Sequence, residues 1–355
     1  DLALDETLAA GLPLLFGGKP TGQATVLDCW SMRHGIDAPL PYEHLKGFGH
    51  LASVTAIARQ GTSEFQPGTK LDYDGKGMQS SALLAAKRGG LDWEDLALER
   101  VLGPCGMDGA DFGQFGKNPA VAGGLRASAL EVMAYADMVL AGGVVPDPDG
   151  AGEPVRVLEP ASVEQLFTDH TGGLPTVSVP FPTTHPGYPY GTPPTYGFGD
   201  WILAQDPATG QVEEVVGAGA WGSYVWMDQR RGLSAVLIVD VPAGSKASID
   251  AALGIFTAAR AAVEASQASG LNVSAAGAGQ VDLSWTTAPG ATSYRVLGSA
   301  RPLLDVFDLA AATELASVTA TTATVPSSPH LAVLATFGTH ENTALVPGSN
   351  VVVAP

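Results

Sequence analysis

The chain has 355 residues, enough for two or three domains, and 45% of them are hydrophobic, so we expect folded globular material. Asp and Glu number 36 against 18 Lys and Arg, which gives a formal net charge of -18. Such a surface repels phosphate backbones and anionic lipids, so nucleic acid is excluded as an expected partner. No apolar run reaches the ~20 residues that a membrane span needs, so we expect no membrane span.

The front of the chain, Asp1-Leu2-Ala3, has neither an initiating Met nor the basic region of a signal peptide. We therefore expect a chain that has been processed or trimmed at its start. Two cysteines, Cys29 and Cys105, could form one disulfide. Their apolar helical or turn contexts fit buried free thiols slightly better.

Residues 1 to about 142 carry helical periodicity interrupted by turns. The predicted helices are Leu45–Ala58, Gly77–Lys87, Trp93–Leu102 and Ala127–Leu140. Between residues 144 and 195 the composition shifts to Pro and Gly, which predicts long loops around one short helix at Ser162–Phe167.

Four strand-like runs follow, and turn residues separate them. The runs are Tyr196–Ala204, Val212–Val216, Ser223–Asp228 and Leu233–Val241. An Ala-rich segment, Ser248–Ser266, can place its large apolar side chains on one face and predicts a long helix. We expect residues 1–267 to form one domain with an antiparallel sheet.

After Gly270 the pattern changes to alternating apolar and polar residues with frequent turns. The predicted strands include Gln280–Trp285, Ser293–Leu297, His330–Phe337 and Ser349–Val353. The sequence therefore predicts a second, all-β domain over residues 270–355, and an α+β fold for the first.

The most specific motif is a Pro-Gly segment that ends in a tyrosine, Pro67-Gly68-Thr69-Lys70-Leu71-Asp72-Tyr73-Asp74-Gly75. It resembles the Pro-Gly-x-x-x-x-Tyr-x-Asn segment of class C β-lactamases, related esterases and DD-peptidases. Further segments are similar to parts of that family in the same order: 25–35, 102–107, 123–128 and 219–228. The resemblance covers roughly residues 1–265 and implies a β-lactamase-like antiparallel sheet with a helical subdomain.

In that family a Ser-x-x-Lys on a central helix supplies the nucleophile and its activating lysine, because an unassisted hydroxyl is too weakly acidic. No Ser-x-x-Lys occurs in this chain. The segment Asp1–Glu6 resembles the one that usually follows the nucleophile helix. The resemblance therefore implies that two strands and this helix would precede Asp1.

The resemblance carries five candidate site residues over to this chain. Tyr73 would act as general base or proton relay, and Gly75 stands where the family has a substrate-holding Asn. Gly217 and Gly219 belong to the third motif, whose usual cation is missing, and the Ala220 N–H would form half of an oxyanion hole. Glycine replaces neither the amide nor the cation. The alternative is that Tyr73 is only a packed tyrosine.

Three histidines, His34, His44 and His50, lie close together in the sequence and could suggest a metal. They lack a Cys partner and a second ligand motif, so ordinary core or surface histidines fit better, and we expect no metal or other cofactor. Lys76 could restore lost positive charge, but a lysine in a glycine-flanked turn is normally solvated.

Three acidic residues lie near Gly150, namely Asp147, Asp149 and Glu153, and their spacing is similar to that in a calcium-binding loop. The segment lacks the glycine at the sixth position and the glutamate at the twelfth that such a loop requires. Neighbouring prolines favour a plain turn.

The C-terminal domain resembles fibronectin type III. Trp285 fits the core tryptophan of strand B, Tyr294 fits strand C, and Leu331–Phe337 fits strand F. The resemblance implies a spacer or adhesion module, and with the acidic surface and trimmed start it indicates a secreted protein, extracellular or periplasmic.

The strand Leu233–Val241 has a strongly apolar centre. In the family two N-terminal strands pair beside it, and an uncovered edge of this kind promotes aggregation. We expect a partner on this edge: an upstream fragment of the same precursor, or a second copy that donates a strand.

Three functions remain open at this level. The first is a serine hydrolase that cleaves an ester or amide in a small molecule or peptide through an acyl-enzyme, inactive without its upstream nucleophile. The second is a pseudoenzyme that binds a small-molecule or peptide ligand. The third is a structural or adhesive extracellular protein, self-assembling by strand donation.

Overall fold

The computed structural model describes residues 2–113, 116–145, 153–179, 194–219, 222–239, 246–337, 340–346 and 349–354. The chain divides into two compact units. The first comprises Asp1–Trp226 and Val236–Asp250, and the second Met227–Ala235 and Ala251–Pro355. The predicted boundary near residues 267–270 stays a prediction. In the described part of the chain, no helix has the length and apolarity needed to cross a membrane.

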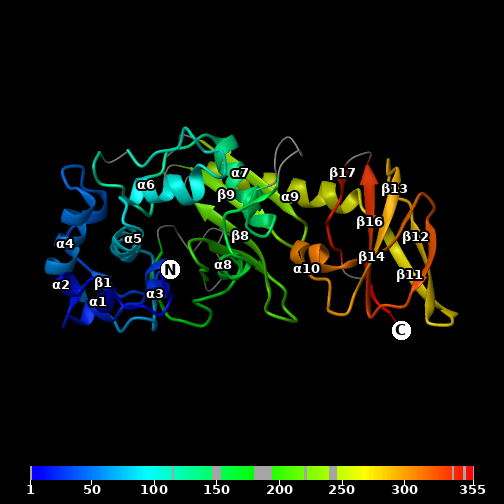
Figure 1. Ribbon diagram of the computed structural model, residues 1–355, viewed down its shortest axis with the longest axis horizontal. Coiled ribbons are helices and arrows are strands. Elements are labelled where there is room, and N and C mark those ends of the chain that lie inside the picture. The colour runs from blue at the N-terminus through cyan, green and yellow to red at the C-terminus, as the bar shows by residue number, and fades with distance from the viewer. Residues whose placement is uncertain are drawn as a thin grey trace. The chain divides into compact units, whose positions relative to one another are not determined.

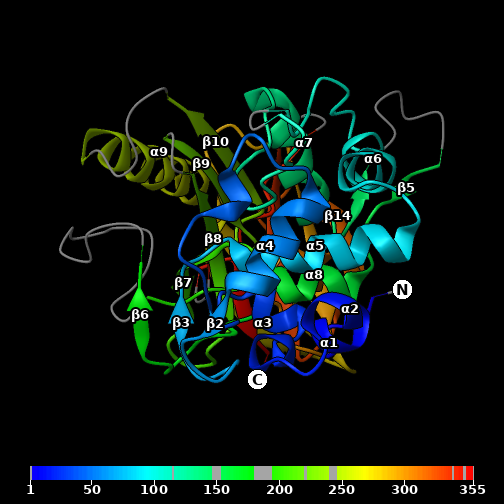
Figure 2. The same ribbon diagram turned by 90° about the vertical axis from the view of Figure 1, so that its left-hand side faces the viewer.

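The first unit begins with helices (Figure 1). They are α1 (Leu8–Gly11), α2 (Pro13–Phe16), α3 (Val26–Trp30), α4 (His50–Gln60), α5 (Lys76–Gly89), α6 (Trp93–Ala97), α7 (Ala129–Leu140) and α8 (Pro160–Leu166), with short turns η1 (Pro20–Gln23), η2 (Tyr42–His44) and η3 (Leu98–Leu102). Helix α5 contacts α1, α3, α4 and α6 and lies among them in Figure 2. Its residue Leu84 is fully buried in the helical core.

The predicted helix Leu45–Ala58 is wrong at its start. A 3-10 turn, η2, ends at His44, and α4 begins only after Gly49. Gly47 and Gly49 explain the difference, because glycine loses more conformational entropy in a helix than other residues. The helix predicted over Trp93–Leu102 is also divided, since its last five residues form the π-helical turn η3.

Helix α7 starts with a capping box, as its sequence favours. The Ser128 hydroxyl accepts a hydrogen bond from the Glu131 N–H at 3.3 Å, and the Glu131 carboxylate accepts one from the Ser128 N–H at 2.7 Å. Each bond satisfies an N–H that the first helical turn leaves open. The turn at 123–128 therefore opens the next helix, as expected.

A four-stranded sheet follows, with the order β10-β9-β8-β7. Its strands are β7 (Trp201–Gln205), β8 (Val212–Ala218), β9 (Ser223–Asp228) and β10 (Leu233–Ile238), and α9 (Lys246–Ala265) comes after them. The strand predicted from Tyr196 starts five residues later, because the chain turns between the two positions: the Gly197 N–H bonds to the Asp200 carbonyl at 2.8 Å, and Tyr196 forms a bridge with Trp201. Of the residues predicted to continue β10, 240 and 241 lie outside the described ranges.

Three short strand pairs accompany this sheet. They are β1 (Ile36–Asp37) with β2 (Thr62–Ser63), β3 (Leu71–Asp72) with β6 (Thr176–Ser178), and β4 (Val144–Val145) with β5 (Val155–Arg156). The pair β3–β6 is parallel. Cys29 and Cys105 are both free and buried, so no disulfide joins them.

The second unit contains two antiparallel sheets, drawn mostly in yellow to red in Figure 1. The first sheet has the order β11 (Ser269–Gly277), β12 (Gln280–Thr286), β15 (Thr322–Pro326). The second has the order β14 (Thr313–Val318), β13 (Ser293–Ser299), β16 (His330–Phe337), β17 (His340–Glu341), and β18 (Val351–Val353) also pairs with β16. Helix α10 (Val306–Ala311) lies between β13 and β14 in the sequence.

One hydrophobic core joins side chains of both sheets. Trp285 on β12 and Tyr294 on β13 contact edge to face with ring centroids 5.3 Å apart. The Tyr294 hydroxyl accepts a hydrogen bond from the Ala288 N–H at 2.9 Å. The predicted positions of Trp285, Tyr294 and Leu331–Phe337 in three different strands are confirmed.

Candidate functional site

Tyr73 lies just after β3, where the parallel pairing with β6 continues through its N–H to the Ser178 carbonyl at 3.3 Å. Its ring stacks on Trp201, with centroids 5.1 Å apart, and meets the edge of Tyr196 at 5.9 Å. Burial, and then the charge of Asp200, raise the pKa of Tyr73 to about 12. The phenol is therefore protonated at neutral pH and is a hydrogen-bond donor.

Gly75 lies at the N-cap of α5 with helical backbone angles. A Cβ at this position would lie 3.0 Å from the Ala122 Cβ and 3.4 Å from the Glu43 Cγ. Space for a longer side chain such as asparagine is therefore limited by these neighbours. A glutamate side chain lies beside the position where the resemblance expects an amide.

Glu43 is a residue of the site that the sequence did not reveal. It is 4% exposed, and its Oε2 has no hydrogen-bond partner among the described residues. Burial, and then the charge of Asp74, raise its pKa to about 7, although Lys76 acts in the opposite direction. A glutamate in a Pro-Tyr-Glu-His turn carries no pattern that would distinguish it from a solvated one.

Lys76 is not the solvated turn residue that the sequence suggested. It is the first residue of α5, its side chain is 8% exposed, and its ammonium is ion-paired with the Asp74 carboxylate. Burial lowers its pKa, but the hydrogen bond and charge of Asp74, with Glu43 and Asp37 nearby, outweigh this and raise it. Helix packing against η2 buries a lysine whose local sequence looked exposed.

His34 holds the backbone next to this ion pair. Its Nδ1 accepts a hydrogen bond from the Ile36 N–H at 3.0 Å, so Nε2 carries the proton and donates to the Asp74 carbonyl at 3.1 Å. Gly77 lets α5 approach the imidazole, because a Cβ there would lie 2.2 Å from the His34 Cδ2. His34 is thus a buried core histidine. Within the described ranges no group of His, Cys, Asp and Glu is arranged to hold a metal ion.

The third motif ends strand β8. Gly217 lies within β8, and the N–H of Gly219 bonds to the Ser223 carbonyl at 2.7 Å. A Cβ on Gly217 would lie 2.8 Å from the Asp200 Oδ1, and one on Gly219 would lie 2.1 Å from the Ser223 Oγ. Ala220, the predicted oxyanion donor, lies outside the described residues, as do Asp147 and Asp149.

Asp200 is the second residue that the sequence did not reveal. The residue is half-buried directly before Trp201, and burial raises its pKa to about 7. Its charge also raises the pKa of Tyr73 and Tyr196, after the larger effect of burial. Asp200 therefore lies against Gly217 of the third motif, and the next residue, Trp201, stacks on Tyr73 of the second, so these two predicted segments lie close together.

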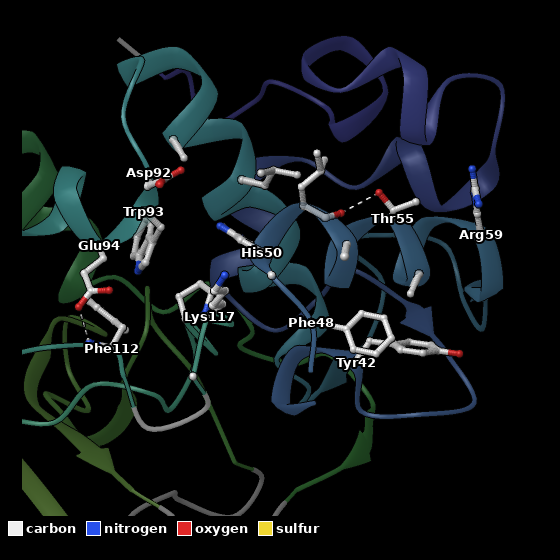
Figure 3. A pocket seen from close by; sticks show the side chains of 18 of the residues that line it. Tyr42, Phe48, His50, Thr55, Arg59, Asp92, Trp93, Glu94, Phe112 and Lys117 are labelled. Carbon is white, nitrogen blue, oxygen red and sulfur yellow. Dashed lines mark hydrogen bonds between the residues drawn. The ribbon is translucent and has the colours of Figure 1, made fainter. Parts of the chain in front are cut away.

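A cavity of about 1230 Å³ lies elsewhere, beside the second half of α5 (Figure 3). Aromatic side chains line it together with polar ones, including Tyr42, Phe48, His50, Trp93, Phe112 and Lys117. The Trp93 Nε1 is buried and has no hydrogen-bond partner among the described residues. None of Tyr73, Gly75, Gly217 and Gly219 lines this cavity.

A comparison with models of protein families identifies the family of this chain. The model named Beta-lactamase matches residues 1–259. The chain belongs to the Beta-lactamase family. This family is one of serine hydrolases with a mixed α and β fold, and the order of elements in the first unit agrees with it. A search of curated proteins found no match.

Solved structures support the same fold at low identity. A candidate beta-lactamase from Bacteroides dorei DSM 17855 is 22% identical, with a TM-score of 0.60 over 73% of this chain and 78% of that one. The D-amino acid amidase from Ochrobactrum anthropi SV3 complexed with D-phenylalanine is 16% identical, with a TM-score of 0.51 over 73% and 84%.

The octameric penicillin-binding protein homologue from Pyrococcus abyssi is 14% identical, with a TM-score of 0.53. This match covers 96% of this chain and 78% of that one, so it extends into the C-terminal strands. At these identities the likeness shows the shared fold alone.

Proposed function

We propose that this family member is the larger part of a serine hydrolase that cleaves an ester or amide through an acyl-enzyme. The nucleophile would be a Ser-x-x-Lys on a segment that precedes Asp1 in the precursor. The observation that carries the proposal is that Gly217 lies against Asp200 while Tyr73 stacks on the next residue, Trp201, so two family motifs far apart in the sequence lie close together. Family membership supports the reaction class.

In this reaction the serine oxygen attacks the carbonyl carbon, and its proton passes to the lysine amine. The tetrahedral oxyanion accepts hydrogen bonds from the Ala220 N–H and the serine N–H. A protonated Tyr73 suits the next step, in which it donates a proton to the leaving group and regains one from the lysine. Water then attacks the acyl carbon, the bond between this carbon and the serine oxygen breaks, and a proton from the water returns to the serine oxygen.

The upstream segment would also cover β10, which is an edge strand of the described sheet. Residues 233–237 of β10 are half-buried and Ile238 is 47% exposed. An apolar edge of this kind favours pairing with another strand. We propose that the upstream segment pairs here; a second copy of the chain that donates a strand is the alternative.

The cavity beside α5 would receive the nucleophile helix. Helix α5 begins at the Tyr73 motif, and its residues Leu83 and Ala86 line the cavity farther along. The volume exceeds the roughly 300–1000 Å³ typical of small-molecule pockets. Its apolar wall fits the helix-in-groove mode of peptide recognition.

The decisive experiment compares the 355-residue chain with the product of the same gene that includes the codons before Asp1. Both are treated with a fluorophosphonate probe, and the labelled residue is located by mass spectrometry. We expect labelling only in the longer product, at the serine of a Ser-x-x-Lys within about thirty residues before Asp1, the length of one helix and a turn. A longer product that stays unlabelled overturns the hydrolase.

Light scattering on the given chain separates the two occupants of β10. A concentration-dependent dimer supports the strand-donating copy. A monodisperse monomer counts against it and leaves the upstream segment.

A second candidate function is ligand binding without chemistry. The altered motifs favour it, because Gly75 and Gly217 supply neither the amide nor the cation that the family has at these positions. A longer product that binds a penicillin reversibly, with no covalent adduct, would support this candidate.

We also propose that the second unit is a fibronectin type III-like module and that the protein is secreted, extracellular or periplasmic. The strand order β11-β12-β15 on one sheet and β14-β13-β16-β17 on the other supports the module. Such modules act as spacers or adhesion domains, which agrees with a third, structural role for this part of the chain.

A further inference from the structure

We propose that the site around Tyr73 selects ligands that carry a positively charged amine and rejects carboxylates. That such a ligand is the substrate rests on the proposed function. That the site binds such a ligand rests on the described residues alone. It follows from the placement of two carboxylates at the two positions where the family motifs have lost their polar side chains.

The first carboxylate lies against the third motif. Its Asp200 Oδ1 is 2.8 Å from where a Cβ of Gly217 would be, so the carboxylate fills the space next to the backbone that would carry the family's cation. No ion pair or hydrogen bond to the Asp200 carboxylate exists among the described residues. The charge beside this position is therefore opposite in sign to the cation that the family usually has there.

The second carboxylate lies against the second motif. Glu43 is more than nine-tenths buried, its Cγ is 3.4 Å from where a Cβ of Gly75 would be, and its Oε2 lacks a hydrogen-bond donor within the described ranges. A buried carboxylate oxygen without a donor is costly, and a cationic ligand would supply that donor.

Lys76, the described cation beside Glu43, lowers the pKa of that carboxyl but is already ion-paired with Asp74, and Arg33 is ion-paired with Asp28 at 3.1 Å. Among the described side chains, neither Glu43 nor Asp200 has an ion-pair partner of its own. A ligand ammonium would supply one, whereas a ligand carboxylate would add like charge in a poorly solvated place.

The test is binding of three probes of nearly equal shape to the given chain, measured by calorimetry at pH 8. The probes are 2-phenylethylamine, 2-phenylethanol and 3-phenylpropanoate. At this pH both carboxylates are ionised and the amine is still protonated. We expect the amine to bind about tenfold or more tightly than the alcohol, and the carboxylate to bind most weakly.

Two variants and a control locate the preference. Asp200→Asn and Glu43→Gln should each remove most of the tenfold difference, whereas Glu159→Gln, which changes an exposed carboxylate at the start of α8, should keep it. Raising the NaCl concentration from 50 to 500 mM should weaken the amine more than the alcohol in the unsubstituted chain, and this measurement needs no variant to fold.

Equal binding of the amine and the alcohol, tighter binding of the carboxylate, or no binding of any probe overturns the proposal. These outcomes are separate from the hydrolase. Because calorimetry needs no nucleophile, amine selection can hold in a protein that hydrolyses nothing. A labelled, longer product that cleaves carboxylate-bearing esters as fast as amine-bearing ones would retain the hydrolase and refute amine selection.

Discussion

At the scale of single residues, the site is controlled by buried charge. Asp74 pairs with Lys76 and shares its surroundings with Glu43, while His34 holds the Asp74 carbonyl. The ion pair with Lys76 stabilises the charged form of Asp74, whereas burial favours the protonated form of Glu43. This difference between two neighbouring carboxylates leads to a measurable dependence of stability on pH.

We expect Glu43→Gln to become increasingly stabilising as the pH rises. The pKa of Glu43 is raised from 4.5 to about 7 in the folded protein, so between these values the folded state holds a proton that the unfolded chain has lost. The stabilisation is complete below pH 4.5 and disappears as the pH passes 7. Glutamine cannot ionise and avoids this loss, which amounts to at most about 3 kcal/mol at pH 8.

Urea unfolding of both proteins at pH 4.5, 6 and 8 measures this difference. Glu159→Gln serves as the control because its side chain is exposed, and its offset from the unsubstituted chain should stay constant. A Glu43→Gln offset that does not change between pH 4.5 and 8 would contradict the shifted pKa.

At the scale of elements, helix α5 positions the site because its first residues carry the motif and its body is buried. Its start depends on the Asp74 carboxylate, which accepts the Lys76 N–H at 2.7 Å, and its end on Gly90, whose φ of 70° is a left-handed C-cap. Between these ends, Gly77 allows the close approach of His34. Helix α9 contains a glycine with open space around it: a Cβ added at Gly254 would have no atom within 4 Å.

The same substitution should therefore have opposite effects in the two helices. Gly77→Ala places a methyl group against an imidazole that two hydrogen bonds hold in position, and should lower the free energy of unfolding by about 1–3 kcal/mol. Gly254→Ala gains helix propensity without a clash and should raise it by up to about 1 kcal/mol. Chemical denaturation of the two variants measures both changes in the free energy of unfolding. A stabilising Gly77→Ala would contradict the prediction and show that His34 is free to move.

At the scale of the whole molecule, the second unit includes residues that the sequence assigns to the first domain. The Gln267 side chain donates to the carbonyls of Asn342 and Ala344 at 2.8 and 2.9 Å and accepts from the Ala335 N–H of β16 at 2.8 Å. Ala268 is fully buried in the core of the two sheets. The C-terminal fold thus uses residues from before Gly270.

Gln267→Leu in the full chain should lower the stability of the second unit by at least about 2 kcal/mol, because buried backbone groups lose their partners. Gln280→Leu, on an exposed side chain of β12, is the matched control and should change stability by no more than about 0.5 kcal/mol. Thermal unfolding of both variants measures the difference in melting temperature from the unsubstituted chain. Equal melting temperatures would mean that Gln267 contributes nothing beyond its backbone.

The sequence by itself determined the family and the order of the elements. Its ordered motifs agree with the family match over residues 1–259, and periodicity located α5, α7, β9 and the strands that carry Trp285 and Tyr294. These features are local, because caps, glycines and alternation act within a few residues. Only the tertiary structure decided which charges are buried. Glu43, Lys76 and Asp200 look like ordinary surface residues in sequence. The burial of Glu43 and Lys76, and the positions of Glu43 beside Gly75 and Asp200 beside Gly217, depend on segments that are distant along the chain.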